Sequence, residues 1–155
     1  MTRYLMERQA VNVRYGMKLD GKAEYIPGGR FYLSEWKSPQ NGITATFKAR
    51  DALEYMRGTY YKGMYSSGGT TLYALAEAVL TDANLPPLRD GSSPWKLDES
   101  LRGITTTAPL PIASYAECLQ LIANAGRCVL TMGRDARVTL APVQAEPSDY
   151  TVSAF

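Results

Sequence analysis

Hydrophobic and polar residues alternate along the first third of the chain. Apolar side chains occupy every second position from Val11 to Met17, and the turn-forming pair Asp20-Gly21 follows. A second alternation runs over residues 31–36, after a Pro27-Gly28-Gly29 segment that is typical of a turn. A period of two predicts β-strands with one apolar face, so this region should form antiparallel strands joined by short turns.

The next stretch, ITATFKARDALEYM, changes its period in the middle. Residues from Ile43 to Ala49 alternate, and the preceding Asn41-Gly42 pair is a strong hairpin signal because both residues tolerate positive φ. Asp51 and Glu54 then have the spacing of a capping box. This predicts a strand that passes directly into a helix of about two turns, ended by Gly58.

A longer helix is predicted after the Thr70-Thr71 cap and before Pro86-Pro87. Its apolar residues recur at helical spacing and would form one buried face: Leu72, Leu75, Ala76, Val79, Leu80 and Ala83. Residues 88–100 are polar and rich in turn residues, which favours an exposed connection with a turn at Asp90-Gly91. Prolines confine any strand in the segment that follows to residues 104–107.

The last predicted helix begins with a second capping box, Ser114 and Glu117, and ends at Gly126. Its side chains at helical spacing would form a buried stripe: Tyr115, Cys118, Leu119, Ile122 and Ala125. Two alternating stretches, residues 128–132 and 137–141, then predict a hairpin.

Together these elements predict an α+β fold. Residues 1–50 would form an antiparallel β lobe, a small sheet or half-barrel of three or four strands. Residues 51–142 would form an α+β lobe in which helices pack on a small β-sheet, with a C-terminal helix-hairpin unit. Residues 143–155 are a linker or a truncated strand. A chain of 155 residues fits one domain or two small lobes that share a core.

The composition limits the classes of partner that we expect for this protein. The 45% hydrophobic and 21% charged residues are typical of a globular protein, and a net charge of +2 is too small for a nucleic-acid footprint. No apolar stretch has the length of a membrane span, and the first ten residues do not resemble a signal peptide. We therefore expect synthesis in a cytoplasm and neither a nucleic acid nor a membrane as partner.

The chain contains no histidine, which removes the usual general base and the common catalytic triads. The best carboxylate pairs are Asp51 with Glu54, better explained as helix capping, and Asp98 with Glu99, better explained as a turn or helix start. Cysteines 118 and 128 are expected to be buried thiols, although a disulfide would form if the last helix packed closely on the following strand. No catalytic residue, cofactor or metal site is predicted.

Tyrosines and basic residues alternate after the first predicted helix. Aromatic and basic side chains interleaved in this way favour a protein contact surface, with stacking on sugars or bases as the alternative. The residues of this possible interface are Arg57, Tyr60, Tyr61, Lys62 and Tyr65.

The order of these elements resembles the tail-hub or baseplate proteins of tailed phages and prophages. The resemblance covers roughly residues 8 to 142, and its individual motifs are common fold signals, so only their order is informative. The matching positions are Gly42, Thr44, Ala45, Phe47, Ala49, Asp51, Leu53, Thr71, Leu72, Ala116, Leu119, Leu121, Ile122, Ala123, Ala125, Gly126, Gly133, Arg134 and Asp135.

This resemblance implies a non-enzymatic structural protein of the virion tail, made in the cytoplasm of a bacterial host. Such hubs form a trimeric ring that joins the tail tube to spike or fibre proteins, through sheet domains like those of contractile-tail and type VI spikes. Family members are several times longer, so the chain would be a fragment of a longer hub. The alternative from the same particle is a glycan-binding or cell-wall-degrading domain, in which a carboxylate pair would face a tyrosine-lined cleft.

Overall fold

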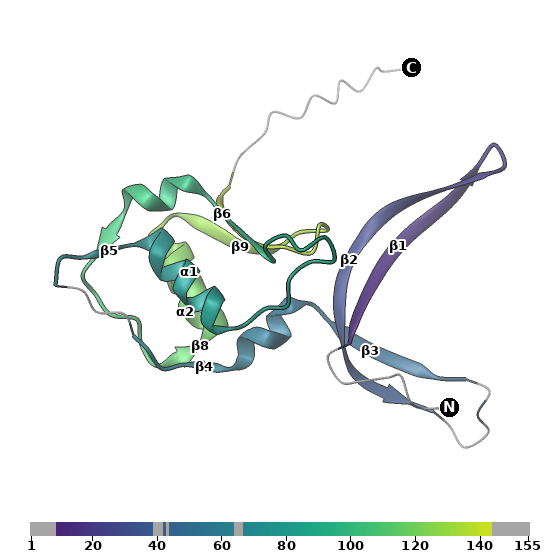
Figure 1. The fold of residues 1–155 in the computed structure, drawn as a ribbon, viewed down its shortest axis with the longest axis horizontal. Coiled ribbons are helices and arrows are strands. Elements are labelled where there is room, and N and C mark those ends of the chain that lie inside the picture. The colour runs from purple at the N-terminus through teal and green to yellow at the C-terminus, as the bar shows by residue number, and fades with distance from the viewer. Residues whose placement is uncertain (1–8, 39–41, 43, 64–66, 144–155) are drawn as a thin grey trace, which may run out of the picture.

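The computed structural model describes residues 9–38, 42, 44–63 and 67–143. The fold is mixed α/β with antiparallel sheets, compatible with the α+β class. A three-stranded sheet projects from a body that contains the two α-helices, which lie side by side (Figure 1). No helix in the described part of the chain is long and apolar enough to cross a membrane.

The projecting sheet has the order β1-β2-β3 and is antiparallel throughout. Its strands are β1 (Ala10–Leu19), β2 (Lys22–Lys37) and β3 (Thr46–Arg50). The expected turn at Asp20-Gly21 joins β1 to β2, and both residues have positive φ. The β1–β2 ribbon extends well away from the body (Figure 1).

The prediction of a turn at Pro27-Gly28-Gly29 is wrong. These residues lie inside one continuous strand, β2, where Gly28 is the extra residue of a bulge opposite Val13 and Arg14. Glycine tolerates the φ of 121° at Gly29, and the Tyr15 ring lies where a Cβ on Gly28 would be. Glycines and proline signal a turn and a bulge equally, which is why the sequence misled.

The strand-to-helix junction at Asp51 forms as expected in outline. Asp51 Oδ1 accepts a hydrogen bond from the Leu53 amide at 3.1 Å and caps the helix η1 (Ala52–Arg57), which has 3₁₀ rather than α geometry. The capping box is wrong, because Glu54 binds Arg50 and Arg57 instead of the Asp51 amide. The preceding strand is also shorter than predicted; it begins at Thr46, and Ile43 lies outside the described residues.

The body forms around the two predicted helices, α1 (Leu72–Asp82) and α2 (Tyr115–Ala125). Thr71 caps α1, and all six residues of its predicted apolar face are buried. The capping box of α2 is complete: Ser114 Oγ accepts from the Glu117 amide at 3.2 Å, and Glu117 Oε2 accepts from the Ser114 amide at 2.9 Å. On α2 the predicted stripe is buried at Cys118, Leu119 and Ile122 and partly buried at Tyr115, but it is wrong at Ala125, which is exposed, and it missed the buried Ala123.

The second three-stranded sheet has the order β6-β10-β9. The predicted hairpin is present as β9 (Cys128–Met132) and β10 (Val138–Pro142), and β10 also pairs in parallel with β6 (Trp95–Leu97). The interpretation of residues 88–100 as a wholly exposed connection is therefore wrong. Three strand residues between polar turns are too few to show a period, and tertiary pairing decides their structure.

Short elements complete the body. Asp98 caps the 3₁₀ helix η2 (Glu99–Gly103), whose Leu101 is fully buried. Four two-residue strands form two small antiparallel pairs, of which β7 lies within the predicted segment 104–107: β4 (Thr59–Tyr60) with β8 (Ala113–Ser114), and β5 (Thr70–Thr71) with β7 (Thr105–Thr106). Each pair joins two segments that are more than thirty positions apart in the sequence.

Candidate functional site

The tyrosine-rich segment does not present all its predicted residues on one surface. Tyr60 is only 1% exposed, and its ring packs 6.0 Å from that of Tyr115. Tyr61 is 73% exposed, whereas Tyr65 lies outside the described residues. Arg57 is the last residue of η1, where it is exposed and pairs with Glu54. Tyr60 is thus a core residue, and an interface role for the others stays a prediction.

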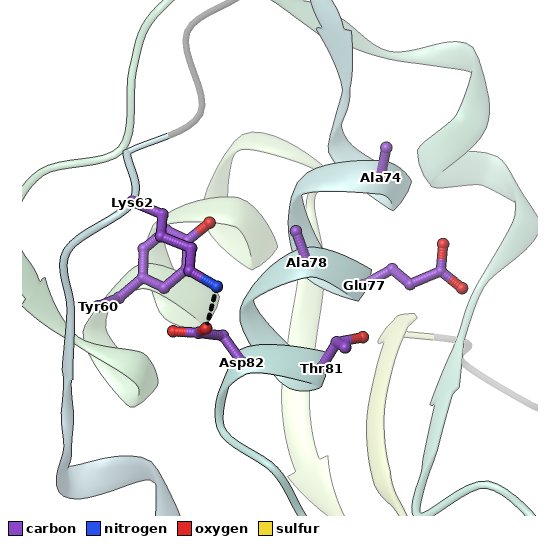
Figure 2. A pocket seen from close by; sticks show the side chains of 7 residues that line it. All are labelled: Tyr60, Lys62, Ala74, Glu77, Ala78, Thr81 and Asp82. Atoms are coloured by element: carbon purple, nitrogen blue, oxygen red, sulfur yellow. Dashed lines mark ion pairs between the residues drawn. The ribbon is translucent and has the colours of Figure 1, made fainter.

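Lys62 has a structural partner in the hollow beside α1 (Figure 2). Its Nζ lies 2.5 Å from Asp82 Oδ1, and the Tyr115 hydroxyl donates to Asp82 Oδ2 at 3.0 Å. The hydrogen bond from Lys62 lowers the pKa of Asp82, and the same bond raises the pKa of Lys62. This cluster ties the segment after β4 to the end of α1 and the start of α2.

The same hollow does not bring two free carboxylates together. Glu77 and Asp82 both line it, but the Glu77 side chain points away from Asp82 in Figure 2, and Asp82 is ion-paired. An acid pair for glycoside hydrolysis needs one carboxyl able to hold a proton and a second facing it across the substrate. The hollow therefore gives the cell-wall-degrading alternative no support.

The carboxylate pairs singled out from the sequence are engaged in local structure. Asp51 caps η1 and Glu54 is held between two arginines. Asp98 Oδ1 accepts from the Ser100 amide at 3.0 Å, a hydrogen bond that lowers the pKa of Asp98, and Glu99 pairs with Arg102. Asp51 and Asp98 thus cap helices, as the sequence favoured, whereas Glu54 and Glu99 form ion pairs with arginines.

Both cysteines are free and buried, as the sequence favoured. Cys118 faces the core from α2, Cys128 opens β9, and burial raises the pKa of each thiol. Among the described residues no group of three His, Cys, Asp or Glu side chains is placed to hold a metal ion.

Several large apolar side chains are exposed on the projecting sheet. In an antiparallel sheet directly paired residues share a face, and so do residues two apart along one strand. Tyr15 pairs with Ile26, Val11 with Phe31, and Trp36 with Phe47. The residues of this face that are exposed by 39% to 67% form what we call the apolar sheet face: Val11, Tyr15, Met17, Leu19, Ile26, Trp36 and Phe47.

Two bulges keep these side chains on one side of the sheet. One extra residue in a strand would turn every later side chain to the other face, but β1 and β3 run without interruption and only β2 carries the insertions, near Gly28 and Ser34. The apolar positions of β2 shift their parity at the same two places. The sequence pattern therefore follows the bulges from Ile26 to Trp36, whereas Lys22 and Glu24, paired with Leu19 and Met17, put charges on this face near the β1–β2 turn.

The opposite face of the sheet binds the body. Tyr32 is buried and its ring lies 4.7 Å from that of Tyr55 in an edge-to-face arrangement. Arg30 Nη1 donates to the Pro87 carbonyl at 2.9 Å. The apolar sheet face thus points away from the core. Sequence analysis found the alternation of β1 but did not say which face is covered, because alternation alone does not decide it.

Comparisons with protein-family models, with curated proteins and with solved structures find no match to this chain.

Proposed function

We propose that the protein is a structural component of a phage or prophage tail, a hub or baseplate domain that acts by protein–protein assembly. The apolar sheet face is the observation that carries this proposal. Single exposed hydrophobic residues are normal, but contiguous apolar patches above a few hundred Å² mark interaction sites. Covering these seven side chains would remove about 800 Å² from water on each subunit, which is one partner's share of a standard stable interface.

The partners in this proposal are copies of the chain, as a trimer in the full-length protein, together with tail-tube and spike or fibre proteins. The three-stranded sheet is then a half-barrel that neighbouring subunits complete. The open edges of the sheet support this arrangement. Within the described residues neither β1 nor β3 pairs along its outer edge, and an open edge is a template for another strand. The protein acts without catalysis and resides in the virion tail.

Self-association tests the surface directly. Light scattering should show a molar mass that rises with the concentration of the chain, and the double variant Tyr15→Thr, Ile26→Thr should stay a monomer. This cross-strand pair lies at the middle of the apolar sheet face, and threonine keeps the preference for strand structure. Tyr25→Thr is the matched control, because Tyr25 is 63% exposed on the opposite face.

A second experiment tests the location in the virion. Particles induced from a bacterium that carries the gene should contain the protein and should lose normal tails when it is deleted. The control variant should restore the tails and the double variant should not. Particles that lack the protein, or tails restored equally by both variants, would contradict the proposed function.

A further inference from the structure

Four arginines line one pocket where the projecting sheet meets the body. Arg14 comes from β1, Arg30 from β2, Arg89 from the loop before β6, and Arg134 from the β9–β10 turn. The pocket has a volume of about 270 Å³, near the lower end of the range for small-ligand sites. The sequence separates these residues by up to 120 positions, so only the fold brings them together.

The pocket holds far more positive than negative charge. Asp135 is its single carboxylate, and Oδ1 of Asp135 accepts from the Arg137 amide at 3.3 Å within its own hairpin turn. Oδ2 of Asp135 lies 3.8 Å from Nη1 of Arg137, which is not one of the four. No ion pair within the described residues engages Arg14, Arg89 or Arg134. The lining of the pocket therefore includes four arginines and one carboxylate that already has a partner.

Arg30 adds an independent observation. Its Nη1 donates to the Pro87 carbonyl, and its guanidinium lies 5.5 Å from the centre of the Tyr32 ring. Its Nε is buried and has no hydrogen-bond acceptor. A buried donor without an acceptor destabilises a fold. Among the described residues two side-chain atoms are of this kind, Arg30 Nε and Arg137 Nε, and only Arg30 lines the pocket.

We propose that this pocket binds a phosphate group, either as the free ion or as a phosphomonoester. A phosphate dianion supplies several acceptor oxygens at once, and the forked guanidinium donors match this geometry better than ammonium groups do. Donors that converge from four segments suit a tetrahedral anion, which accepts in several directions. This site is separate from the apolar sheet face, and the inference does not depend on the proposed role in a tail.

Binding would join the sheet to the body. Two of the arginines belong to the sheet and two to loops of the body, so a bound anion contacts both sides of the junction. The anion would then stabilise the orientation of the sheet, because its binding free energy is lost when the two sides separate. Phosphate should accordingly raise the resistance of the whole chain to urea.

Titrations at constant ionic strength test the site. Inorganic phosphate should raise the urea midpoint saturably and should shift the NMR signal of the Arg30 Nε–H group, whereas chloride should do neither. Arg30→Gln and Arg89→Gln should each weaken phosphate binding about tenfold. Arg89 is an exposed loop residue, so the second variant should fold even if the first does not. Arg127→Gln is the control, since Arg127 is exposed and lies outside the pocket.

Methyl phosphate distinguishes the two sources. Equal binding of phosphate and methyl phosphate identifies a site for phosphomonoesters, and binding of phosphate alone identifies a site for the free ion. The proposal is overturned if phosphate acts no more strongly than chloride, or if the pocket variants respond as the parent and the Arg127 variant do.

Discussion

Two leucines of α2, two positions apart, should respond very differently to the same substitution. Leu119 is 0% exposed in the core, whereas Leu121 is 46% exposed on the outer side of the helix. Leu119→Ala removes three carbon atoms from a closed site, a loss of about 2.4 kcal/mol at 0.8 kcal/mol for each buried carbon. The cavity that remains raises the total to about 3–4 kcal/mol.

Leu121→Ala should lower the free energy of unfolding by only about 1 kcal/mol, because half of its side chain is already in water and no closed cavity forms. Alanine also favours the helix slightly more than leucine. Urea unfolding followed by circular dichroism measures both values, and equal m-values would show that the denatured states are comparable. A difference below about 1 kcal/mol between the variants would refute the orientation of α2.

Two further changes test the junctions of the fold. Asp82→Asn should reduce the fall in the free energy of unfolding as the pH is lowered. The folded-state pKa of Asp82 is lowered, so its stabilisation is complete above about pH 4 and is lost as the pH falls through the folded value. Urea midpoints measured on the acid side for both proteins check this, and identical slopes would contradict it. Gly29→Ala should destabilise by about 1–3 kcal/mol because φ at Gly29 is 121°. Gly68→Ala, at an open position, should be near neutral in the same thermal unfolding assay.

Local signals predicted most of the secondary structure. The capping residues Thr71 and Ser114 and the helical spacing of apolar residues fixed both α-helices, since a cap and a buried stripe act within a few turns of chain. The alternating stretches after Gly126 also predicted the β9–β10 hairpin correctly. Two of the misses share a cause: at Pro27-Gly28-Gly29 and at Trp95–Leu97, pairing with another strand decided the conformation.

In the candidate site too, the sequence located the segments, and contacts between distant segments decided which side chains are exposed. The tyrosine-rich segment was found by composition, yet Tyr60 is buried because β4 pairs with β8, more than fifty residues away. The apolar sheet face was found only as an alternation, which left open whether that side is covered or exposed. Its exposure follows from Tyr32 and Arg30, which attach the other side of the sheet to the body.

The sequence by itself determined where the two α-helices begin and end and which residues of β1 share a side, because these properties depend on neighbours a few positions apart. Only the tertiary structure decided which side of the sheet is covered and which arginines meet at its base. Those outcomes depend on contacts between segments that are distant in sequence, and the period of a strand is the same whether its apolar side faces the core or the solvent.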